Sequence, residues 1–247
     1  MKRYAFFLDI DGTTLANGVI PEENVAAINA AVENGHYVFV CTGRSYSRLG
    51  PVVLDAANWS GVITSLGAEI HFGGEKIRNR TLSPELAEKI ASEILKSDVW
   101  LIAGNGDGCI AINRDDAKSV RVNDEASFAS ALKGITKLDM SPTLPEKIEQ
   151  LVSEEMKIFY HKTYSEAAIK DVSKSEAIEF ILKKLNVPRE NSVAIGDSVN
   201  DLDMLEYAGI GVAVANASEE VKAAADMITE SEVNCGVAKA IREICGI

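Results

Sequence analysis

The sequence predicts an α/β fold in which a parallel sheet is covered by helices on both faces and a separate α+β domain is inserted. Near both ends of the chain, continuous apolar segments alternate with amphipathic helical patterns, which is typical of strands buried in a parallel sheet. Between about residues 82 and 165 this alternation gives way to helices and hairpin-like strands. Apolar residues make up 47% of the 247 positions, enough for a large core and a smaller insert.

The first part of the core, residues 1–81, is predicted to form a strand, a helix and two further strands. Pro21 and the two glutamates after it favour a helix start, and Gly35 can end that helix. The strands are nearly continuous apolar runs, as expected for segments buried on both faces. The predicted elements are strands over 4–8, 37–41 and 61–64 and a helix over 21–34.

Residues 82–165 are predicted to form the inserted α+β domain. The segment Asn-Gly-Asp-Gly over 105–108 separates two apolar stretches and therefore predicts a β-hairpin. Amphipathic helical patterns precede and follow this hairpin. The predicted elements are helices over 82–96 and 142–154, hairpin strands over 100–103 and 109–112, and a strand over 156–160.

The α/β alternation returns in residues 166–247, which complete the core. Ser173 and Lys174 begin an amphipathic helix, and short apolar strands then alternate with helices. The predicted elements are helices over 173–185, 202–208, 221–225 and 237–244 and strands over 193–195, 210–214 and 227–228. In such a sheet the carboxyl ends of the strands gather at one edge, where ligands bind.

The composition limits the possible partners. The formal net charge of −12 argues against a general nucleic-acid binder and against binding to an anionic membrane. The apolar stretches are too short to span a bilayer, and the one near the N-terminus ends at Asp9 as a strand, so no signal peptide is expected. The four cysteines show neither metal-type nor C-x-x-C spacing, so we expect reduced thiols and a cytoplasmic protein.

Asp9 and Asp11 are informative because a carboxylate at the end of an apolar strand is costly unless something there needs it. Side chains two apart share one face, roughly 7 Å apart, and Gly12 lets the backbone turn away. Two close carboxylates repel unless a cation neutralises them or one keeps a proton, so they suit Mg²⁺ or a nucleophile with a proton shuttle. An EF-hand loop is excluded because Ile20 occupies its twelfth position. An ordinary polar turn is the alternative for this motif alone.

Other polar residues occupy equivalent places along the chain. Thr42 follows the second strand, Asp197 follows the strand after the insert, and Lys174 begins a helix. Taken alone, the segment from Asp197 to Asp201 could be a helix cap, and a lysine at a helix start is usually a solvated cation. Together, carboxylates, a hydroxyl and an ammonium at one sheet edge suit Mg²⁺ and a phosphoryl group.

Four segments in this order resemble the motifs of the haloacid dehalogenase superfamily. They are Asp9-Ile10-Asp11-Gly12-Thr13, Val40-Cys41-Thr42-Gly43-Arg44, Lys174 and Gly196-Asp197-Ser198-Val199-Asn200-Asp201. The insert resembles that of the C2B-capped, Cof-type sugar-phosphatase-like branch, and the tail over 211–217, 221–226 and 234–238 is similar to that branch too. The resemblance implies a Rossmann-like core of residues 1–81 and 166–247 and a cap domain of residues 82–165.

The resemblance also implies a reaction. Asp9 would attack phosphorus and form an aspartyl-phosphate, while Asp11 would protonate the leaving oxygen and then take a proton from the hydrolytic water. Thr42 would hydrogen-bond the phosphoryl oxygens and Lys174 would offset their charge. The full implied set of phosphate-binding residues is Thr42, Gly43, Lys174 and Asn200.

Mg²⁺ is the cofactor that the resemblance implies. Its ligands would be Asp9, the backbone carbonyl of Asp11, and Asp197, and it would act as Lewis acid and template. Asp201 would complete the metal site in or near the outer shell, where it orients waters or Lys174. Arg44 is a candidate for contact with the leaving group, and a surface role is the alternative.

Two positions depart from the pattern of this branch. Thr14 stands where the branch usually has an apolar residue, which is a small change. Leu66, in Ser65-Leu66-Gly67-Ala68, replaces the asparagine of the family's Asn-Gly-Ala stretch and removes a polar side chain near the rim of the expected site. The insert is also short for the branch, so we expect a small cap.

The sequence therefore predicts a Mg²⁺-dependent phosphatase of small phosphorylated metabolites. Sugar phosphates come first, followed by phosphoglycolate, pyridoxal phosphate and flavin mononucleotide. A phosphosugar mutase is the nearest alternative, and a non-catalytic phosphometabolite sensor is the alternative of another class. The expected partner is a small-molecule phosphomonoester, and the expected assembly is a monomer or small homo-oligomer. The polar insert residues to test for specificity are Asn113, Arg114 and His161, each also compatible with a surface role.

Overall fold

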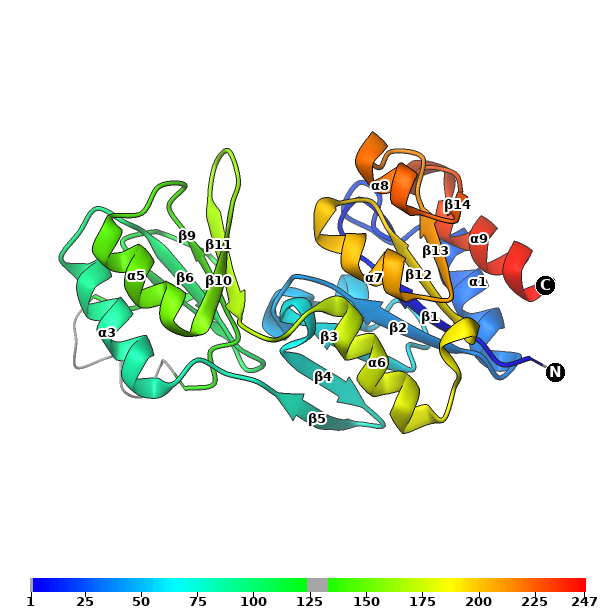
Figure 1. Cartoon of the computed structure of the whole chain (residues 1–247), viewed down its shortest axis with the longest axis horizontal. Coiled ribbons are helices and arrows are strands. Elements are labelled where there is room, and N and C mark those ends of the chain that lie inside the picture. Colours follow the sequence, from blue (N-terminus) through cyan, green and yellow to red (C-terminus); the bar gives the residue numbers. More distant parts are fainter. Residues whose placement is uncertain (1, 124–132) are drawn as a thin grey trace. The chain divides into compact units, whose positions relative to one another are not determined.

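The computed structural model describes residues 2–123 and 133–247, which fold into two compact units (Figure 1). The first unit contains the residues up to Gly43 together with Leu49–Ile77 and Ser173–Ile247. The second contains the described residues of Arg44–Arg48 and Arg78–Val172. Each unit has a sheet and a hydrophobic core of its own.

The first unit is built on an eight-stranded sheet with the order β14-β13-β12-β1-β2-β3-β4-β5. The pairs from β14 to β3 are parallel, and β4 runs antiparallel to β3. Phe6, Phe7 and Leu8 of the central strand are fully buried, which explains its continuous apolar sequence. The strands are β1 (Ala5–Leu8), β2 (Tyr37–Cys41), β3 (Gly61–Thr64), β4 (Glu69–Phe72), β5 (Glu75–Asn79), β12 (Ser192–Gly196), β13 (Ile210–Ala213) and β14 (Met227–Ile228).

Helices cover both faces of this sheet. The connections from β1 to β2 and from β12 to β13 run in opposite directions across it, so right-handed crossovers place α1 and α7 on opposite faces. Helix α9 packs against α1, and α6 packs against α7. The helices are α1 (Glu22–Glu33), α2 (Pro51–Leu54), α6 (Lys174–Leu185), α7 (Leu202–Tyr207), α8 (Glu219–Ala224) and α9 (Gly236–Cys245).

The second unit has a six-stranded sheet with the order β10-β11-β9-β6-β7-β8. Its pairs are antiparallel except for β7 and β8, which are parallel. The two described helices of this unit pack against each other, and their apolar side chains join those of the sheet in one core. The elements are α3 (Pro84–Leu95), β6 (Leu101–Gly104), β7 (Cys109–Ile112), β8 (Val120–Arg121), β9 (Lys137–Met140), α5 (Glu146–Glu155), β10 (Met156–Tyr160) and β11 (Ser165–Ile169).

The predicted fold class is confirmed: a parallel sheet with helices on both faces carries an inserted α+β unit. Strands β4, β5, β9 and β11 and the short β8 are additions to the predicted elements. The chain passes back to the first unit after Val172 rather than at 165/166, because β11 pairs with β9 and β10 in the second sheet. None of the described helices is long and apolar enough to cross a membrane.

Candidate active site

Asp9 follows the central strand β1 at the carboxyl edge of the first sheet. Its backbone N–H donates to Ile195 O at 3.0 Å, so the pairing with β12 continues one residue beyond the strand. The residue is 6% exposed, although it carries a carboxylate. A buried carboxylate needs a charged or hydrogen-bonding partner, and the residues around it supply one.

The turn after Asp9 is fixed by hydrogen bonds from hydroxyl and amide side chains. The Thr14 hydroxyl donates to Asp9 O at 2.5 Å, and Asn216 Nδ2 donates to Gly12 O at 2.7 Å. Gly12 has a φ of +77°, which favours glycine, and an added Cβ would lie 2.6 Å from Asp197 Oδ2. The Thr13 hydroxyl donates to Asp197 Oδ1 at 2.6 Å. This turn therefore holds the Asp197 carboxylate in place.

Replacing Gly12 with alanine should lower stability by about 1–2 kcal/mol because of its left-handed backbone. The new Cβ should also displace Asp197 Oδ2, so that added Mg²⁺ should stabilise the variant less than it stabilises the wild type. Thermal unfolding with and without Mg²⁺ measures both effects. Gly18→Ala is the matched control, because Gly18 has a φ of +83° but no atom within 4 Å of an added Cβ. An equal loss of the Mg²⁺ response in both variants would contradict this account.

The segment after β12 forms a capping box that fixes Asp201. One oxygen of this carboxylate, Oδ2, accepts hydrogen bonds from Asp197 N at 3.1 Å, Ser198 N at 3.0 Å and Ser198 Oγ at 3.0 Å. Asp201 is fully buried, and the Cβ that an alanine would place at Gly196 lies 2.6 Å from its Cβ. Asp201 thus has a single orientation, with its other oxygen, Oδ1, turned to Lys174.

Lys174 is the first residue of α6, after Ser173, whose side chain caps the helix. It is 2% exposed, and its ammonium donates to Asp9 Oδ1 at 2.6 Å and to Asp201 Oδ1 at 2.5 Å. Although burial opposes its charge, the Asp201 and Asp9 carboxylates raise the pKa of Lys174 well above its ordinary value. Lys174 is therefore a buried ammonium that links two carboxylates.

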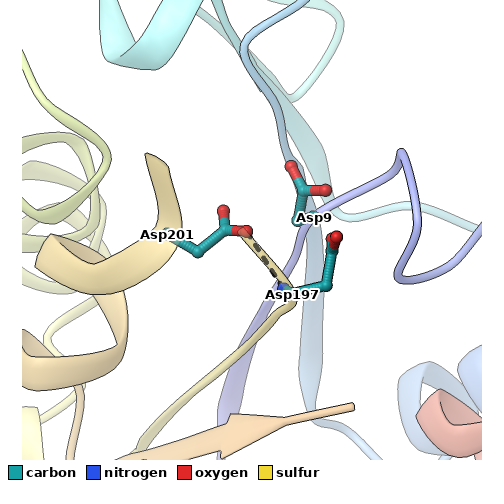
Figure 2. Close-up of side chains that lie close together, drawn as sticks. All are labelled: Asp9, Asp197 and Asp201. Carbon is teal, nitrogen blue, oxygen red and sulfur yellow. Dashed lines mark hydrogen bonds between the residues drawn. The ribbon is translucent and has the colours of Figure 1, made fainter. Parts of the chain in front are cut away.

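Three carboxylates lie close together at this edge (Figure 2): Asp9 follows β1, Asp197 follows β12, and Asp201 immediately precedes α7. Asp9, Asp197 and Asp201 each offer an oxygen within 4.8 Å of the others. Burial, and then the nearby Asp201, raise the pKa of Asp9, while burial raises the pKa of Asp197 to about 6. One ammonium cannot neutralise three carboxylates, so the negative charge that remains favours the binding of a hard cation.

Apart from Arg44, the other predicted residues belong to the same unit as this cluster. Thr42 is buried at the end of β2, and Gly43 lies beside Leu66, whose Cδ2 would be 3.4 Å from an added Cβ. Asn200 is in the 3-10 turn Val199–Asp201. The Asp11 side chain is exposed, and it is not part of the described carboxylate cluster. Arg44 belongs to the second unit rather than the first.

Leu66 adopts a backbone conformation that is unusual for a bulky residue. It has φ 56° and ψ 26°, and its neighbours Ser65 and Gly67 also have positive φ. Leu66 N donates to Thr42 O at 3.2 Å, and a Cβ on Gly67 would lie 2.5 Å from Ser173 O. Strain of this kind is typical of functional sites, and here it lies between Thr42 and the start of α6.

All three polar insert residues have contacts within the second unit. Asn113 Nδ2 donates to the carbonyls of Ile94, Ser97 and Val99, which is a structural role. The Arg114 guanidinium lies 3.9 Å from the centre of the Trp100 ring. The His161 ring stacks on Tyr164 and lies 3.5 Å from a carboxylate oxygen of Glu166, which is paired in turn with Lys137 at 2.8 Å.

Sequence reasoning missed residues that orient the site rather than form it. The Thr13 hydroxyl and the Ser198 cap are the clearest cases. Ser198 could have been found, because a serine three residues before an acidic residue is the pattern of a capping box. Asn216 could not, since nothing in the local sequence shows that its amide reaches Gly12 O, 204 residues away.

The chain is similar to known phosphatases over almost its whole length. A family model for haloacid dehalogenase-like hydrolases matches residues 6–241. The chain is 29% identical over 260 residues to the 5-amino-6-(5-phospho-D-ribitylamino)uracil phosphatase YcsE of Bacillus subtilis (strain 168), covering 95% of this chain and 93% of the relative. It is 27% identical over 245 residues to the phosphoglycolate phosphatase of Methanothermobacter thermautotrophicus, covering 98% and 99%.

Solved structures agree with the family match. The fold is similar to that of the phosphatase BT1666 from Bacteroides thetaiotaomicron, with a TM-score of 0.81, 26% identity and coverage of 100% of this chain and 96% of that one. The subclass IIB sugar phosphatase BT4131 has the same fold, with a TM-score of 0.81, 24% identity and coverage of 99% and 100%. The resemblance of the sequence motifs is confirmed, and the chain belongs to the haloacid dehalogenase-like hydrolases.

Proposed function

We propose that this protein is a Mg²⁺-dependent phosphatase that hydrolyses small phosphorylated metabolites through an aspartyl-phosphate on Asp9. The observation that carries the proposal is the placement of Asp9. Its carboxylate is buried at a strand end, held by Lys174 at 2.6 Å and grouped with Asp197, while the exposed Asp11 follows two residues later. A positioned nucleophile beside a proton donor is what this hydrolysis requires.

The donor set fits Mg²⁺, which takes hard oxygen ligands. Asp9 uses Oδ1 for Lys174 and Asp197 uses Oδ1 for Thr13, so Oδ2 of each is the atom that would hold the metal. Both oxygens of Asp201 accept hydrogen bonds, so Asp201 would orient Lys174 and the Asp197 backbone from the outer shell. When bound, the metal would neutralise negative charge at the phosphoryl group.

The proposed reaction has two displacements. In the first, an Asp9 oxygen bonds to phosphorus, the bond from phosphorus to the substrate oxygen breaks, and Asp11 gives that oxygen its proton. In the second, water attacks the same phosphorus, Asp11 takes the proton of the water, and the bond from phosphorus to the Asp9 oxygen breaks. Lys174 holds Asp9 throughout and offsets the charge of the phosphoryl oxygens.

The class of substrate follows from the charge of the protein and from its relatives. With a net charge of −12, the protein offers an anionic substrate local cations such as Lys174 rather than an attractive surface. The activities of these relatives, on a phosphoribitylamino-uracil and on phosphoglycolate, support a small phosphomonoester. Sugar phosphates are the first substrates to test.

The test is phosphate release from a panel of sugar phosphates, phosphoglycolate, pyridoxal phosphate and flavin mononucleotide, with Mg²⁺ and with EDTA. We expect release that requires the metal and returns when Mg²⁺ is added back. Acid quenching during turnover of a substrate labelled in its phosphate should leave label on the protein. Isomerisation of a sugar phosphate without release would instead indicate a mutase, and binding without turnover would indicate a sensor.

A further inference from the structure

A short segment directly after the expected phosphate-binding residues leaves the first unit and returns to it. Residues Arg44–Arg48, here called the strap, follow Thr42 and Gly43 and precede Leu49, which belongs to the first unit again. The strap contains the 3-10 turn Tyr46–Arg48 and packs in the second unit, beside β6 and β7. The two units are thus joined by the strap as well as by the connections at 77/78 and 172/173.

The middle of the strap is fitted closely to the β6–β7 hairpin. A Cβ on Gly104 would lie 2.6 Å from Ser45 Oγ, so glycine is required there for the strap to approach. Ser47 Oγ lies within donor distance of two carbonyls of the hairpin turn, Asn105 O at 2.8 Å and Gly108 O at 3.1 Å. The hairpin turn, predicted from the sequence as a turn alone, is therefore also a docking site.

Arg48 anchors the end of the strap with its whole guanidinium. Two nitrogens donate to Asp116, at 2.7 and 3.2 Å, and the same guanidinium donates to Ser119 Oγ at 2.9 Å and from Nε to Cys109 Sγ at 3.1 Å. The side chains of Arg48 and Asp116 are 22% and 20% exposed. The Arg48 hydrogen bonds hold the pKa of Asp116 below its usual value. Such a bidentate, partly buried pair fixes position more strongly than an exposed ion pair.

The other end of the strap is connected to the first sheet by a very short segment of chain. Thr42 N donates to Ile63 O at 2.9 Å, and Thr42 O accepts from Leu66 N at 3.2 Å. Between this bonded residue and the packed Ser45 lie Gly43 and Arg44, and three residues of chain reach no further than about 10 Å. A displacement of the docked strap by a few ångströms must therefore move Gly43 or Thr42.

We propose that Arg48 and Asp116 are positioning residues for the phosphate-binding end of β2. The strap stays docked on the second unit during turnover, so the placement of Thr42 and Gly43 depends on the second unit through the Arg48–Asp116 pair. Phosphate binding at Thr42 and Gly43 is then coupled to the docking of the strap on the second unit. The coupling free energy is the same in both directions, so a change in docking alters phosphate affinity by the factor by which phosphate alters docking. This inference rests on the proposed phosphatase function.

The first experiment neutralises the anchor with Asp116→Asn. We expect the KM for the best substrate and the inhibition constant of inorganic phosphate to rise by about fivefold or more, with a smaller change in kcat. Asp115→Asn is the matched control, because the neighbouring Asp115 pairs with Arg121 on the surface, where the two side chains are 89% and 55% exposed. It should change neither constant by more than about twofold.

The second experiment locks the strap in place. Ser47 Oγ lies 3.4 Å from Cys109 Sγ, so Ser47→Cys brings two thiols within reach of a disulfide. With the bond formed, as checked by mass spectrometry, we expect kcat and phosphate inhibition within about twofold of the reduced form. Ser47→Cys combined with Cys109→Ser controls for the oxidant. Should the bond not form, the Asp116→Asn comparison decides alone.

These results separate failure of the inference from failure of the proposed function. An inactive wild-type protein would count against the phosphatase, before any variant is made. An active wild type with unchanged constants in Asp116→Asn would overturn the positioning role. Activity lost on oxidation of Ser47→Cys and recovered with a reductant would show that the strap must leave the second unit during turnover, which also overturns the proposal.

Discussion

Replacing Asp9 with asparagine should abolish phosphatase activity, by about 10⁴-fold or more, while making the metal-free protein more stable. Activity falls because an amide cannot serve as the nucleophile. Stability rises because burial and the nearby Asp201 carboxylate raise the pKa of Asp9 to about 8. At pH 7 the folded wild type must therefore either hold an unfavourable charge at Asp9 or take up a proton, and asparagine carries neither cost. The amide oxygen can still accept the hydrogen bond from Lys174. Thermal unfolding in EDTA measures the expected gain in stability, and phosphate release measures the expected loss of activity.

The pH dependence of stability follows from the same charges. Burial raises the pKa of Asp197 to about 6, whereas an aspartate side chain in water has an ordinary pKa of 3.8. The folded protein therefore binds more protons than the unfolded chain between about pH 4 and 6, and stability falls as the pH rises through this window. The raised pKa of Asp9 extends the fall to higher pH. In Asp9→Asn the fall should be smaller, and in the wild type Mg²⁺ should oppose it.

The control for Asp9→Asn is Asp55→Asn, which neutralises an exposed carboxylate of the same unit. It should leave activity, stability and the Mg²⁺ response close to those of the wild type. If Asp9→Asn were less stable than the wild type in EDTA at pH 7, the account of a repulsive cluster would be wrong. If it kept measurable turnover, Asp9 would not be the nucleophile.

The convergence of Asp9 and Asp197 could be predicted because it depends on topology alone, whereas Lys174 begins helix α6 and its role was implied only by the family motifs. Parallel strands end at one edge of the sheet, so polar residues that follow apolar strands meet there whatever their side-chain rotamers. The capping of Asp201 and the hydrogen bond from Thr13 to Asp197 depend on rotamers and on turn geometry. These details are set by packing, which a single sequence does not encode locally.

The strands that sequence reasoning missed have a physical reason in common. The sequence of β5, Glu-Lys-Ile-Arg-Asn, shows no apolar face, because this strand lies at the edge of its sheet. Strand β11 begins with the buried polar residues Ser165 and Glu166, whose partners are Ser141 O and the Lys137 ammonium. Their burial depends on distant residues, so the pattern of β11 did not indicate a strand.

The strap is the largest feature that the sequence did not indicate. Its residues follow a predicted phosphate-binding motif, so their sequence neighbours all belong to the first unit. The contacts of Arg48 are with Cys109, Asp116 and Ser119, at least 61 residues away along the chain. The predicted contact of Arg44 with the leaving group assumed that Arg44 belongs to the first unit, like the residues before it. In the structure, Arg44 Nη1 donates to Arg48 O at 3.5 Å within the strap.

Replacing Lys174 with methionine should have the opposite effect on stability from Asp9→Asn. Methionine matches the length of lysine but leaves the Asp9 and Asp201 carboxylates without their shared counter-ion. Because Lys174 is 2% exposed, solvent cannot compensate, and the loss should be about 3–5 kcal/mol at pH 7. Activity should fall by about 10³-fold, since the nucleophile loses its orienting contact and the phosphoryl group a positive charge. Urea unfolding and phosphate release measure the two losses.

Three comparisons decide whether the loss comes from the buried charges. Lys183→Met, on the same helix, removes an ammonium that is 73% exposed and pairs with Glu179, and it should cost less than about 1 kcal/mol. Adding Asp201→Asn to Lys174→Met should restore part of the stability but none of the activity, because one uncompensated charge is removed while the counter-ion of Asp9 stays absent. The defect of Lys174→Met should also shrink at acid pH, where the carboxylates are protonated. A Lys174→Met variant as stable as the wild type at pH 7 would mean that neither Asp9 nor Asp201 needs the Lys174 ammonium as a counter-ion, and would contradict this account.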